Sequence, residues 1–195
     1  MDTGQSFGSL FTPALPLPNR LLVVFGPHGG AAAMLDLAAR LSLRGQLYIL
    51  DCGNRSDMYR VAKTLRTLTS DPAAKLKNIR LSRAFTCYQV VALLEKLSAG
   101  EEVPVLILDL LATFMDESVH AAESKTLFGI AMNHIVQVSL TAPVVVSARP
   151  LMSISSPRFG LLEQLKAGAS QVWEEAGLPQ PGRVEAQLPL FADYA

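Results

Sequence analysis

Residues 21–51, LLVVFGPHGGAAAMLDLAARLSLRGQLYILD, decide the fold class of this chain. The apolar run Leu21–Phe25 predicts a fully buried strand, and a glycine-rich turn over residues 26–30 follows it. An Ala-rich helix to about Leu43 and a second buried strand, Gln46–Leu50, complete the unit. Strand, glycine-rich turn, helix and strand in this order are typical of the start of a nucleotide-binding α/β domain.

The glycine-rich turn has the backbone of a phosphate-binding loop without its side chains. Such a loop reads GxxxxGK[ST]: main-chain N–H groups hold the phosphates, the Lys neutralises their charge and the hydroxyl binds Mg²⁺. Aligning this pattern on Gly26 places alanines where the second Gly, the Lys and the Ser/Thr would stand. His28 is either a substitute phosphate contact or a loop residue with no specific role. The degenerate loop comprises Gly26, His28, Gly29, Gly30, Ala31, Ala32 and Ala33.

The composition predicts a folded cytoplasmic chain without a strong electrostatic field. Of its 195 residues half are hydrophobic and 17% are charged, which favours one domain with a sizeable core. The apolar runs are too short to span a bilayer, and the start MDTGQSFGSL lacks the basic and apolar regions of a signal peptide. Because the formal net charge is zero, any DNA contact would need a local patch or a partner protein.

Further buried strands alternate with helices along the chain. Strands are predicted at residues 78–81, 103–108 and 143–147, and the main helices at about 57–68, 87–98 and 122–140. Near-continuous apolar strands separated by helices predict an α/β three-layer sandwich with a mostly parallel central sheet. Residues 159–167 also look helical, and residues 169–175 fit either an extension of that helix or a further strand. The chain divides into an N-terminal arm (1–20), a core (21–176) and an extended C-terminal tail (177–195).

Four segments carry a resemblance to a known family. They are the strand–turn–helix of residues 21–43, the strand ending in YILDCGNRSD (48–57), the segment LSRAFTCYQVVALL (81–94), and VLILDLLATFMDE (105–117), which is similar to a Walker B strand with its terminal Asp. In their order and spacing, residues 21–175 resemble the RecA-like ATPase core, above all strand-exchange recombinase paralogues and circadian-clock ATPases. The resemblance implies a RecA-like three-layer sandwich.

The resemblance also assigns roles to single residues. In working members the Walker B carboxylate, here Asp109, orients Mg²⁺ through water. Without the loop Lys and hydroxyl it has little metal to hold, and the alternative is an Asp that closes a strand. The family places a DNA-binding loop after its fourth core strand, where Arg149 and Arg158 stand. They could contact phosphates weakly and in a salt-sensitive way, or they are solvated surface arginines.

No pattern of hydrolase or metal chemistry occurs elsewhere in the chain. It contains no HExxH or CxxC motif and no Ser-His-Asp arrangement, and the neighbouring loop carboxylates Asp116 and Glu117 have no His or Ser partner. We therefore predict that the chain is not an enzyme and that it uses no cofactor or metal.

The tail contains QLPLF, which resembles the pentapeptide QL(S/D)LF by which bacterial polymerases and repair factors bind the sliding clamp. It departs from that pattern at Pro189. An extended segment would insert Leu190 and Phe191 into an apolar pocket, Leu188 would add contact, and the Gln187 amide would fix the register by hydrogen bonds. The alternative is a tail that packs these leucines onto its own core.

The arm contains Phe11-Thr12-Pro13-Ala14, which fits the FxxA pattern that recombinase protomers use to bind a neighbour. Phe11 would fill a pocket on an adjacent core, and Ala14 a smaller one beside it. The alternative is an arm that folds back onto its own domain.

Together these features predict a catalytically degenerate RecA-like accessory protein of the bacterial DNA damage response, acting in DNA repair, recombination or translesion synthesis. This pseudo-ATPase would bind the sliding clamp through its tail and a recombinase or translesion polymerase subunit through its core, with homo- or hetero-oligomers both compatible with the pattern. The RecA-like branch of cell-division inhibitors and mutagenesis accessory proteins has likewise lost the phosphate loop. The alternatives are a weak ATP-binding ATPase or nucleotide sensor of the RecA family, and a regulatory scaffold unrelated to DNA.

Overall fold

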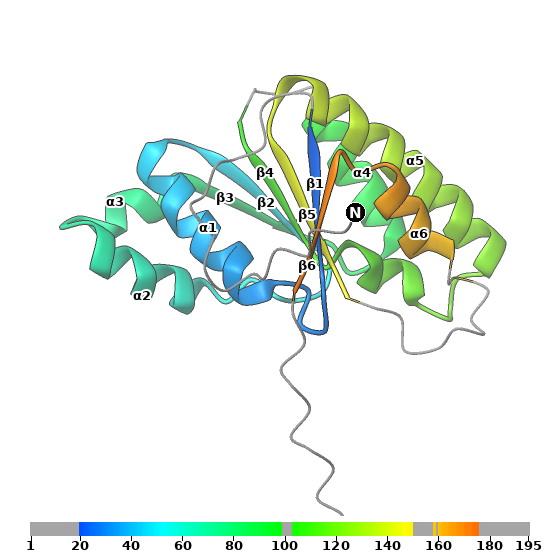
Figure 1. Ribbon diagram of the computed structural model, residues 1–195, viewed down its shortest axis with the longest axis horizontal. Coiled ribbons are helices and arrows are strands. Elements are labelled where there is room, and N and C mark those ends of the chain that lie inside the picture. Colours follow the sequence, from blue (N-terminus) through cyan, green and yellow to red (C-terminus); the bar gives the residue numbers. More distant parts are fainter. Residues whose placement is uncertain (1–19, 99–102, 150–157, 159, 176–195) are drawn as a thin grey trace, which may run out of the picture.

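In the part of the chain that the structure describes, six parallel strands form a central sheet (Figure 1), in the order β3-β2-β4-β5-β1-β6. Every neighbouring pair is parallel, so the predicted sheet direction is confirmed. Residues 169–175, for which the sequence left helix and strand open, contain the edge strand β6, which pairs with β1. The strands are β1 (Leu21–Phe25), β2 (Leu47–Asp51), β3 (Ile79–Arg83), β4 (Val105–Leu108), β5 (Val144–Ala148) and β6 (Gln171–Glu174).

The computed structural model describes residues 20–98, 103–149, 158 and 160–175. The FxxA residues Phe11 and Ala14 lie outside the described residues. The clamp-motif residues Gln187, Leu188, Leu190 and Phe191 lie outside them as well, and so does most of the loop between Arg149 and Gly160. In the described part of the chain no helix is long and apolar enough to cross a membrane.

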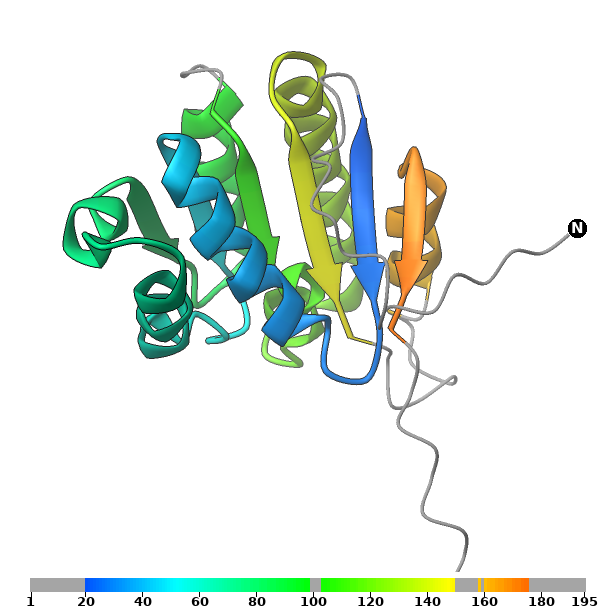
Figure 2. The same ribbon diagram turned by 60° about the vertical axis from the view of Figure 1, so that its left-hand side comes forward.

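Helices cover both faces of the sheet, so the chain is a three-layer α/β sandwich (Figure 2). One layer contains α1 (Ala31–Arg44), α2 (Met58–Leu68) and α3 (Pro72–Leu76). The other contains α4 (Cys87–Ser98), the 3-10 helix η1 (Leu110–Met115), α5 (Ala121–Thr141) and α6 (Gly160–Ala167).

Strands β1 and β4, inside the sheet, are apolar throughout because both of their faces are buried, whereas the edge strands β3 and β6 carry polar residues. Along β1, Leu22 and Val24 pack against the α1–α2 layer, whereas Leu21 and Val23 pack against the α4–α5 layer. The same alternation runs along β4 and β5. A strand with two buried faces has no solvent side to carry polar residues, which explains the continuous apolar runs in the sequence.

An Asp side chain caps the start of two helices. At α2, the Asp57 carboxylate accepts hydrogen bonds from the N–H groups of Tyr59 and Arg60. At α3, the Asp71 carboxylate accepts a hydrogen bond from the Ala74 N–H. Pro72 stands in the first turn of α3, where a main-chain N–H has no partner within the helix, so its missing N–H costs nothing.

Candidate functional site

The carboxyl ends of all six strands lie at one edge of the sheet, and the predicted site residues gather there. The connection after β1 leads to α1 in one helix layer, whereas the connection after the neighbouring β5 leads to α6 in the other layer. In open α/β sheets, ligands bind outside the carboxyl ends of strands at such a divergence. The degenerate loop, Asp109 and Arg149 flank this point.

The turn after β1 has the backbone shape of an anion-binding loop. Gly29 and Gly30 have φ values of 59° and 56°, a left-handed conformation that glycine adopts without strain. A Cβ atom on Gly29 would also stand 3.2 Å from Cγ of Arg149. The turn closes with a hydrogen bond of 2.8 Å from the Gly29 N–H to the Gly26 carbonyl, and α1 begins at Ala31.

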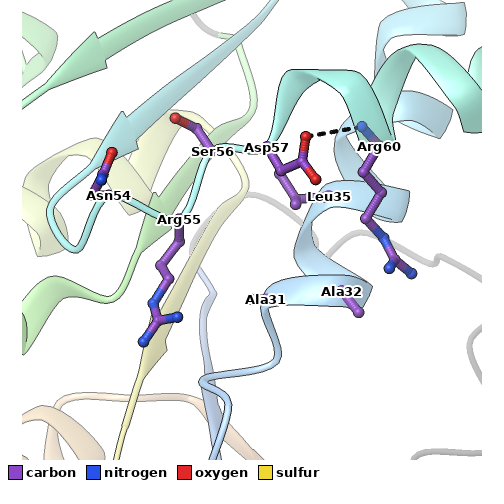
Figure 3. Close-up of a pocket in the computed structure, with 8 residues that line it drawn as sticks. All are labelled: Ala31, Ala32, Leu35, Asn54, Arg55, Ser56, Asp57 and Arg60. Atoms are coloured by element: carbon purple, nitrogen blue, oxygen red, sulfur yellow. Dashed lines mark hydrogen bonds between the residues drawn. The ribbon is translucent and has the colours of Figure 1, made fainter.

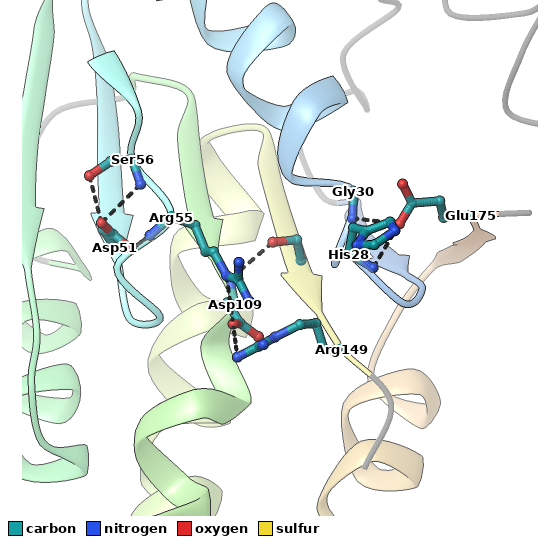
Figure 4. Close-up of polar contacts among 9 residues, drawn as sticks. His28, Gly30, Asp51, Arg55, Ser56, Asp109, Arg149 and Glu175 are labelled. Carbon is teal, nitrogen blue, oxygen red and sulfur yellow. Dashed lines mark hydrogen bonds and ion pairs between the residues drawn. The ribbon is translucent and has the colours of Figure 1, made fainter. Parts of the chain in front are cut away.

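A carboxylate from the other end of the core occupies this loop (Figure 4). Oε2 of Glu175 accepts hydrogen bonds from the main-chain N–H groups of His28 (3.2 Å) and Gly30 (3.1 Å). The loop wraps closely around it, since a Cβ atom on Gly26 would lie 2.3 Å from Cβ of Glu175. A negative charge at a helix N-terminus is favourable, so the chain supplies its own anion where a phosphate would be held.

Sequence reasoning did not find Glu175, which follows β6 in a segment whose secondary structure was undecided. The contact spans 147 residues between His28 and Glu175, and no local pattern encodes a pair of that separation. The glycine-rich loop is the one indirect signal, because its main-chain N–H groups need an acceptor whether or not a phosphate is bound.

The three alanines of the loop begin α1, and two of them, Ala31 and Ala32, border a shallow, open pocket of about 390 Å³ (Figure 3). Where a Lys would reach a phosphate, Ala32 presents only a methyl group to the pocket. Arg60 at the pocket rim is paired with Asp36 at 3.3 Å, and both side chains are well exposed. The pocket lies between α1 and the β2–α2 connection and is lined by Ala31, Ala32, Leu35, Asn54, Arg55, Ser56, Asp57 and Arg60.

Asp109, the Walker B-like residue, is buried and paired with two arginines. Its Oδ2 lies 2.7 Å from Nη2 of Arg149 and 3.5 Å from Nε of Arg55. Its main-chain N–H donates to the Ser147 hydroxyl on β5, and its side chain makes no capping bond to η1. Two guanidinium groups thus contact the carboxylate that would orient Mg²⁺ in a working ATPase.

A second buried carboxylate, Asp51, fixes the connection that carries Arg55. Its side chain is fully buried and accepts hydrogen bonds from the N–H groups of Arg55 (2.8 Å) and Ser56 (3.1 Å), the Ser56 hydroxyl (2.5 Å) and Nε of Arg83 (3.2 Å). Burial is the largest single influence and raises the pKa of Asp51. Hydrogen bonds from Ser56, Arg55 and Arg83 together outweigh it, and the pKa lies below its ordinary value.

The lowered pKa of Asp51 makes the free energy of unfolding depend on pH in the acidic range. A carboxyl whose pKa is lower in the folded than in the unfolded chain stabilises fully above its ordinary pKa of 3.8, and that stabilisation is lost as the pH falls through the folded value. We expect the free energy of unfolding to fall less steeply below pH 4 in Asp51→Asn than in the natural chain. Ser56→Ala, which removes the hydroxyl donor, should give an intermediate slope. Urea unfolding at a series of pH values measures this, and identical slopes in all three chains would contradict it.

The two arginines predicted for a DNA loop both make contacts within the chain. Arg149 pairs with Asp109. Arg158 is 8% exposed, and its Nη2 donates to the main-chain carbonyls of Asp116 (3.1 Å) and Val119. Its Nη2 group is held against the chain, and the side chain leaves little exposed surface for a DNA contact.

The neighbouring carboxylates Asp116 and Glu117 are exposed. Hydrogen bonds from Ser118 lower the pKa of Asp116, and the Ser118 N–H lies 2.9 Å from its carboxylate. Across the described ranges, no group of three or more His, Cys, Asp and Glu side chains is placed to hold a metal ion. The donor set around Asp109 therefore suits a guanidinium better than Mg²⁺, which binds oxygen ligands and water.

Comparison of the sequence with protein-family models and with curated proteins finds no match.

Proposed function

We propose that this chain is a catalytically degenerate, RecA-like accessory protein of bacterial DNA repair, recombination or translesion synthesis, which acts by binding other proteins. The QLPLF motif of the tail supports the assignment to DNA repair, and one structural observation supports the loss of catalysis: charged groups of the chain itself occupy both halves of the site where a RecA-like ATPase would hold a nucleotide. The Glu175 carboxylate binds the loop N–H groups, and Arg149 and Arg55 contact Asp109.

These internal contacts would compete with the binding of a nucleotide and its magnesium ion. A phosphate at the loop would meet the Glu175 carboxylate on the same N–H groups, and like charges at hydrogen-bonding distance repel. A magnesium ion at Asp109 would have to displace the Arg149 guanidinium, which lies 2.7 Å away. The loop has no Lys to compensate, and each charge-assisted hydrogen bond that Lys would supply is worth ~1.5–3 kcal/mol.

We therefore expect no ATP binding below millimolar concentrations and no ATP turnover. Titration calorimetry with ATP and Mg²⁺, together with a phosphate-release assay, measures both. Micromolar affinity would favour a nucleotide sensor or weak ATPase of the same family in place of the accessory protein.

A restored loop tests the cause of this loss. In Ala31→Gly/Ala32→Lys/Ala33→Ser the missing loop residues return, but we expect affinity to stay weak while Glu175 occupies the N–H groups. Adding Glu175→Gln removes the competing charge and should tighten ATP binding at least tenfold, about 1.4 kcal/mol. Equal affinity with Glu175 and with Gln at that position would show that the internal carboxylate does not block the loop.

The proposed clamp contact would be made by the tail, which leaves the core at a fixed point. Glu175 is hydrogen-bonded to the loop, and its N–H donates to the Phe25 carbonyl at 2.7 Å. The QLPLF motif begins 12 residues later (187 minus 175), a reach of at most about 43 Å in extended chain. Such a reach would let the motif engage a clamp while the core binds a recombinase or translesion polymerase subunit.

A pull-down from a lysate of the source organism tests both contacts. The intact chain should retain the sliding clamp, and a chain lacking residues 186–195 should lose it while keeping its second partner. Loss of neither protein, or capture of partners unrelated to DNA, would favour a regulatory scaffold instead.

A further inference from the structure

The outer face of α5 lacks the charges that mark the other surface helices. From Thr126 to Thr141 the helix contains no Asp, Glu, Lys or Arg. Three of its apolar side chains are exposed: Ile130 (39%), Val136 (39%) and Leu140 (49%). Val136 and Leu140 are four residues apart and therefore neighbours on the helix surface.

The solvent sides of other helices differ from this face. Exposed positions of α2 carry Arg60, Lys63 and Arg66, and those of α4 carry Glu95 and Lys96. A surface helix normally carries charged and polar residues opposite its buried face. The outer face of α5 between residues 126 and 141 is therefore suited to packing against another segment of protein.

The N-terminal arm joins the core at the edge of the sheet where α5 ends. Leu21, the first residue of β1, pairs with Val144 of β5, and α5 ends at Thr141, directly before β5 (Figure 2). The start of β1, to which residues 1–19 are linked in sequence, therefore lies close to the last turn of α5, the turn that carries the exposed Leu140.

The arm matches the face in length and in chemistry. Nineteen residues can reach about 60 Å when extended, whereas the 21 residues of α5 extend over about 31 Å. Asp2 is the one charged side chain in residues 1–19, and the segment carries five large apolar residues, Phe7, Leu10, Phe11, Leu15 and Leu17. Pro13, Pro16 and Pro18 favour an extended segment over a helix.

We propose that residues 3–19 of the arm pack against the outer face of α5 in the same chain, over Ile130, Val136 and Leu140. A tethered segment meets a nearby face at an effective concentration in the millimolar range, which favours this contact over the same contact between copies. The proposal is independent of the clamp and nucleotide proposals. It competes with docking of Phe11 and Ala14 on a neighbouring protomer.

A thermodynamic cycle of four chains tests the contact: the full chain, deletion of residues 2–17, Val136→Ser/Leu140→Ser, and the combination. We expect the deletion to lower the melting temperature of the full chain by about 4 °C or more, since about 1 kcal/mol corresponds to ~2–4 °C at this size. In the Val136→Ser/Leu140→Ser background the deletion should cause no further drop. Equal drops in both backgrounds, or none in the full chain, would overturn the proposal.

The matched control is Leu68→Ser, an exposed apolar residue on α2 in the opposite helix layer. There the deletion should lower the melting temperature as it does in the full chain. Hydrogen exchange gives a second readout: deletion should speed exchange of the amides over residues 136–141 about tenfold and leave α2 unchanged.

Protein concentration separates contact within one chain from contact between copies. If the arm binds its own α5, the effect of the deletion should not change over a 100-fold range of concentration, and sedimentation should give the same oligomeric state with and without the arm. An oligomer that dissociates when the arm is removed would place the arm on another copy and overturn the proposal.

Discussion

A peptide of residues 184–195 should bind the sliding clamp of the source organism with micromolar affinity, and Leu190→Ala/Phe191→Ala should weaken that binding at least 100-fold. Micromolar affinity corresponds to about −8 kcal/mol, which is modest because an extended segment loses chain entropy on binding. Each of the two anchors is worth ~1.5–3 kcal/mol when fully buried. Their joint loss of roughly 3–6 kcal/mol therefore exceeds two factors of ten. Fluorescence anisotropy with labelled peptides measures both affinities.

Two variants separate clamp binding from packing of the tail onto the core. Pro189→Ser should retain or improve the affinity, because it restores a residue of the common pentapeptide. In the whole chain, Leu190→Ala/Phe191→Ala should leave the melting temperature nearly unchanged. A large drop in melting temperature together with no peptide binding would show that these residues belong to the core.

Arg149→Ala should lower the free energy of unfolding by about 2–4 kcal/mol, whereas Arg60→Ala should change it by less than about 1 kcal/mol. Both substitutions break an arginine–aspartate pair whose arginine is about equally exposed (40% for Arg149, 45% for Arg60), but the two carboxylates differ in burial. The Asp109 side chain is 3% exposed, whereas Asp36, the partner of Arg60, is 43% exposed. Breaking a buried pair costs ~3–5 kcal/mol because a desolvated charge remains, and an exposed pair is worth ~0–1 kcal/mol. We expect less than the full buried value because Arg55 stays near Asp109.

Urea unfolding at neutral pH measures this difference. Asp109→Asn/Arg149→Ala should recover part of the lost stability, since the uncompensated carboxylate is then absent. Equal losses in the Arg149 and Arg60 variants would mean that the Arg149–Asp109 contact is as weakly coupled as a surface pair. The same measurement is needed before any effect of Arg149→Ala on DNA binding is assigned to a DNA contact.

The fold class could be predicted from the sequence because the inner strands of the sheet are buried on both faces. The runs 21–25 and 105–108 are apolar throughout, and no other structure suits such short runs between helices as well as a parallel sheet. The strand ends were less predictable. Asp51 lies inside β2 because its carboxylate is fully satisfied by hydrogen bonds, which polarity alone does not reveal.

Structure that depends on distant contacts could not be predicted. The sequence predicted no helix between residues 108 and 122, but the 3-10 helix η1 forms there because Leu110 and Phe114 are buried, and the Phe114 ring packs edge-to-face on Phe128 at 5.2 Å. Residues 169–175 have no decisive periodicity. Their pairing with β1 determines that they contain a strand.

The sequence predicted one partner of each contact in the candidate site, but not the other, because the second partner lies far away in sequence. The end of an apolar strand identified Asp109, and the spacing from Gly26 identified the degenerate loop. Their partners Arg149 and Glu175 directly follow β5 and β6. The sheet order places β5 beside β4, which ends before Asp109, and β6 beside β1, which ends before the loop. Because Arg149 was considered only for DNA and Glu175 not at all, the sequence suggested an empty site where the structure has internal ion pairs and hydrogen bonds.

The attachment of β6 also determines how the core would respond to mechanical force. A partner pulling on the tail would load β6 from its carboxyl end, along the direction of the strand and therefore in shear against β1. Such a force would act first on the hydrogen bonds of Glu175. Its N–H donates to the Phe25 carbonyl, and its carboxylate accepts from the N–H groups of His28 and Gly30. Tension would therefore reach the glycine loop before the rest of the sheet. The first contacts to break under load would be the hydrogen bonds from the loop N–H groups to Glu175.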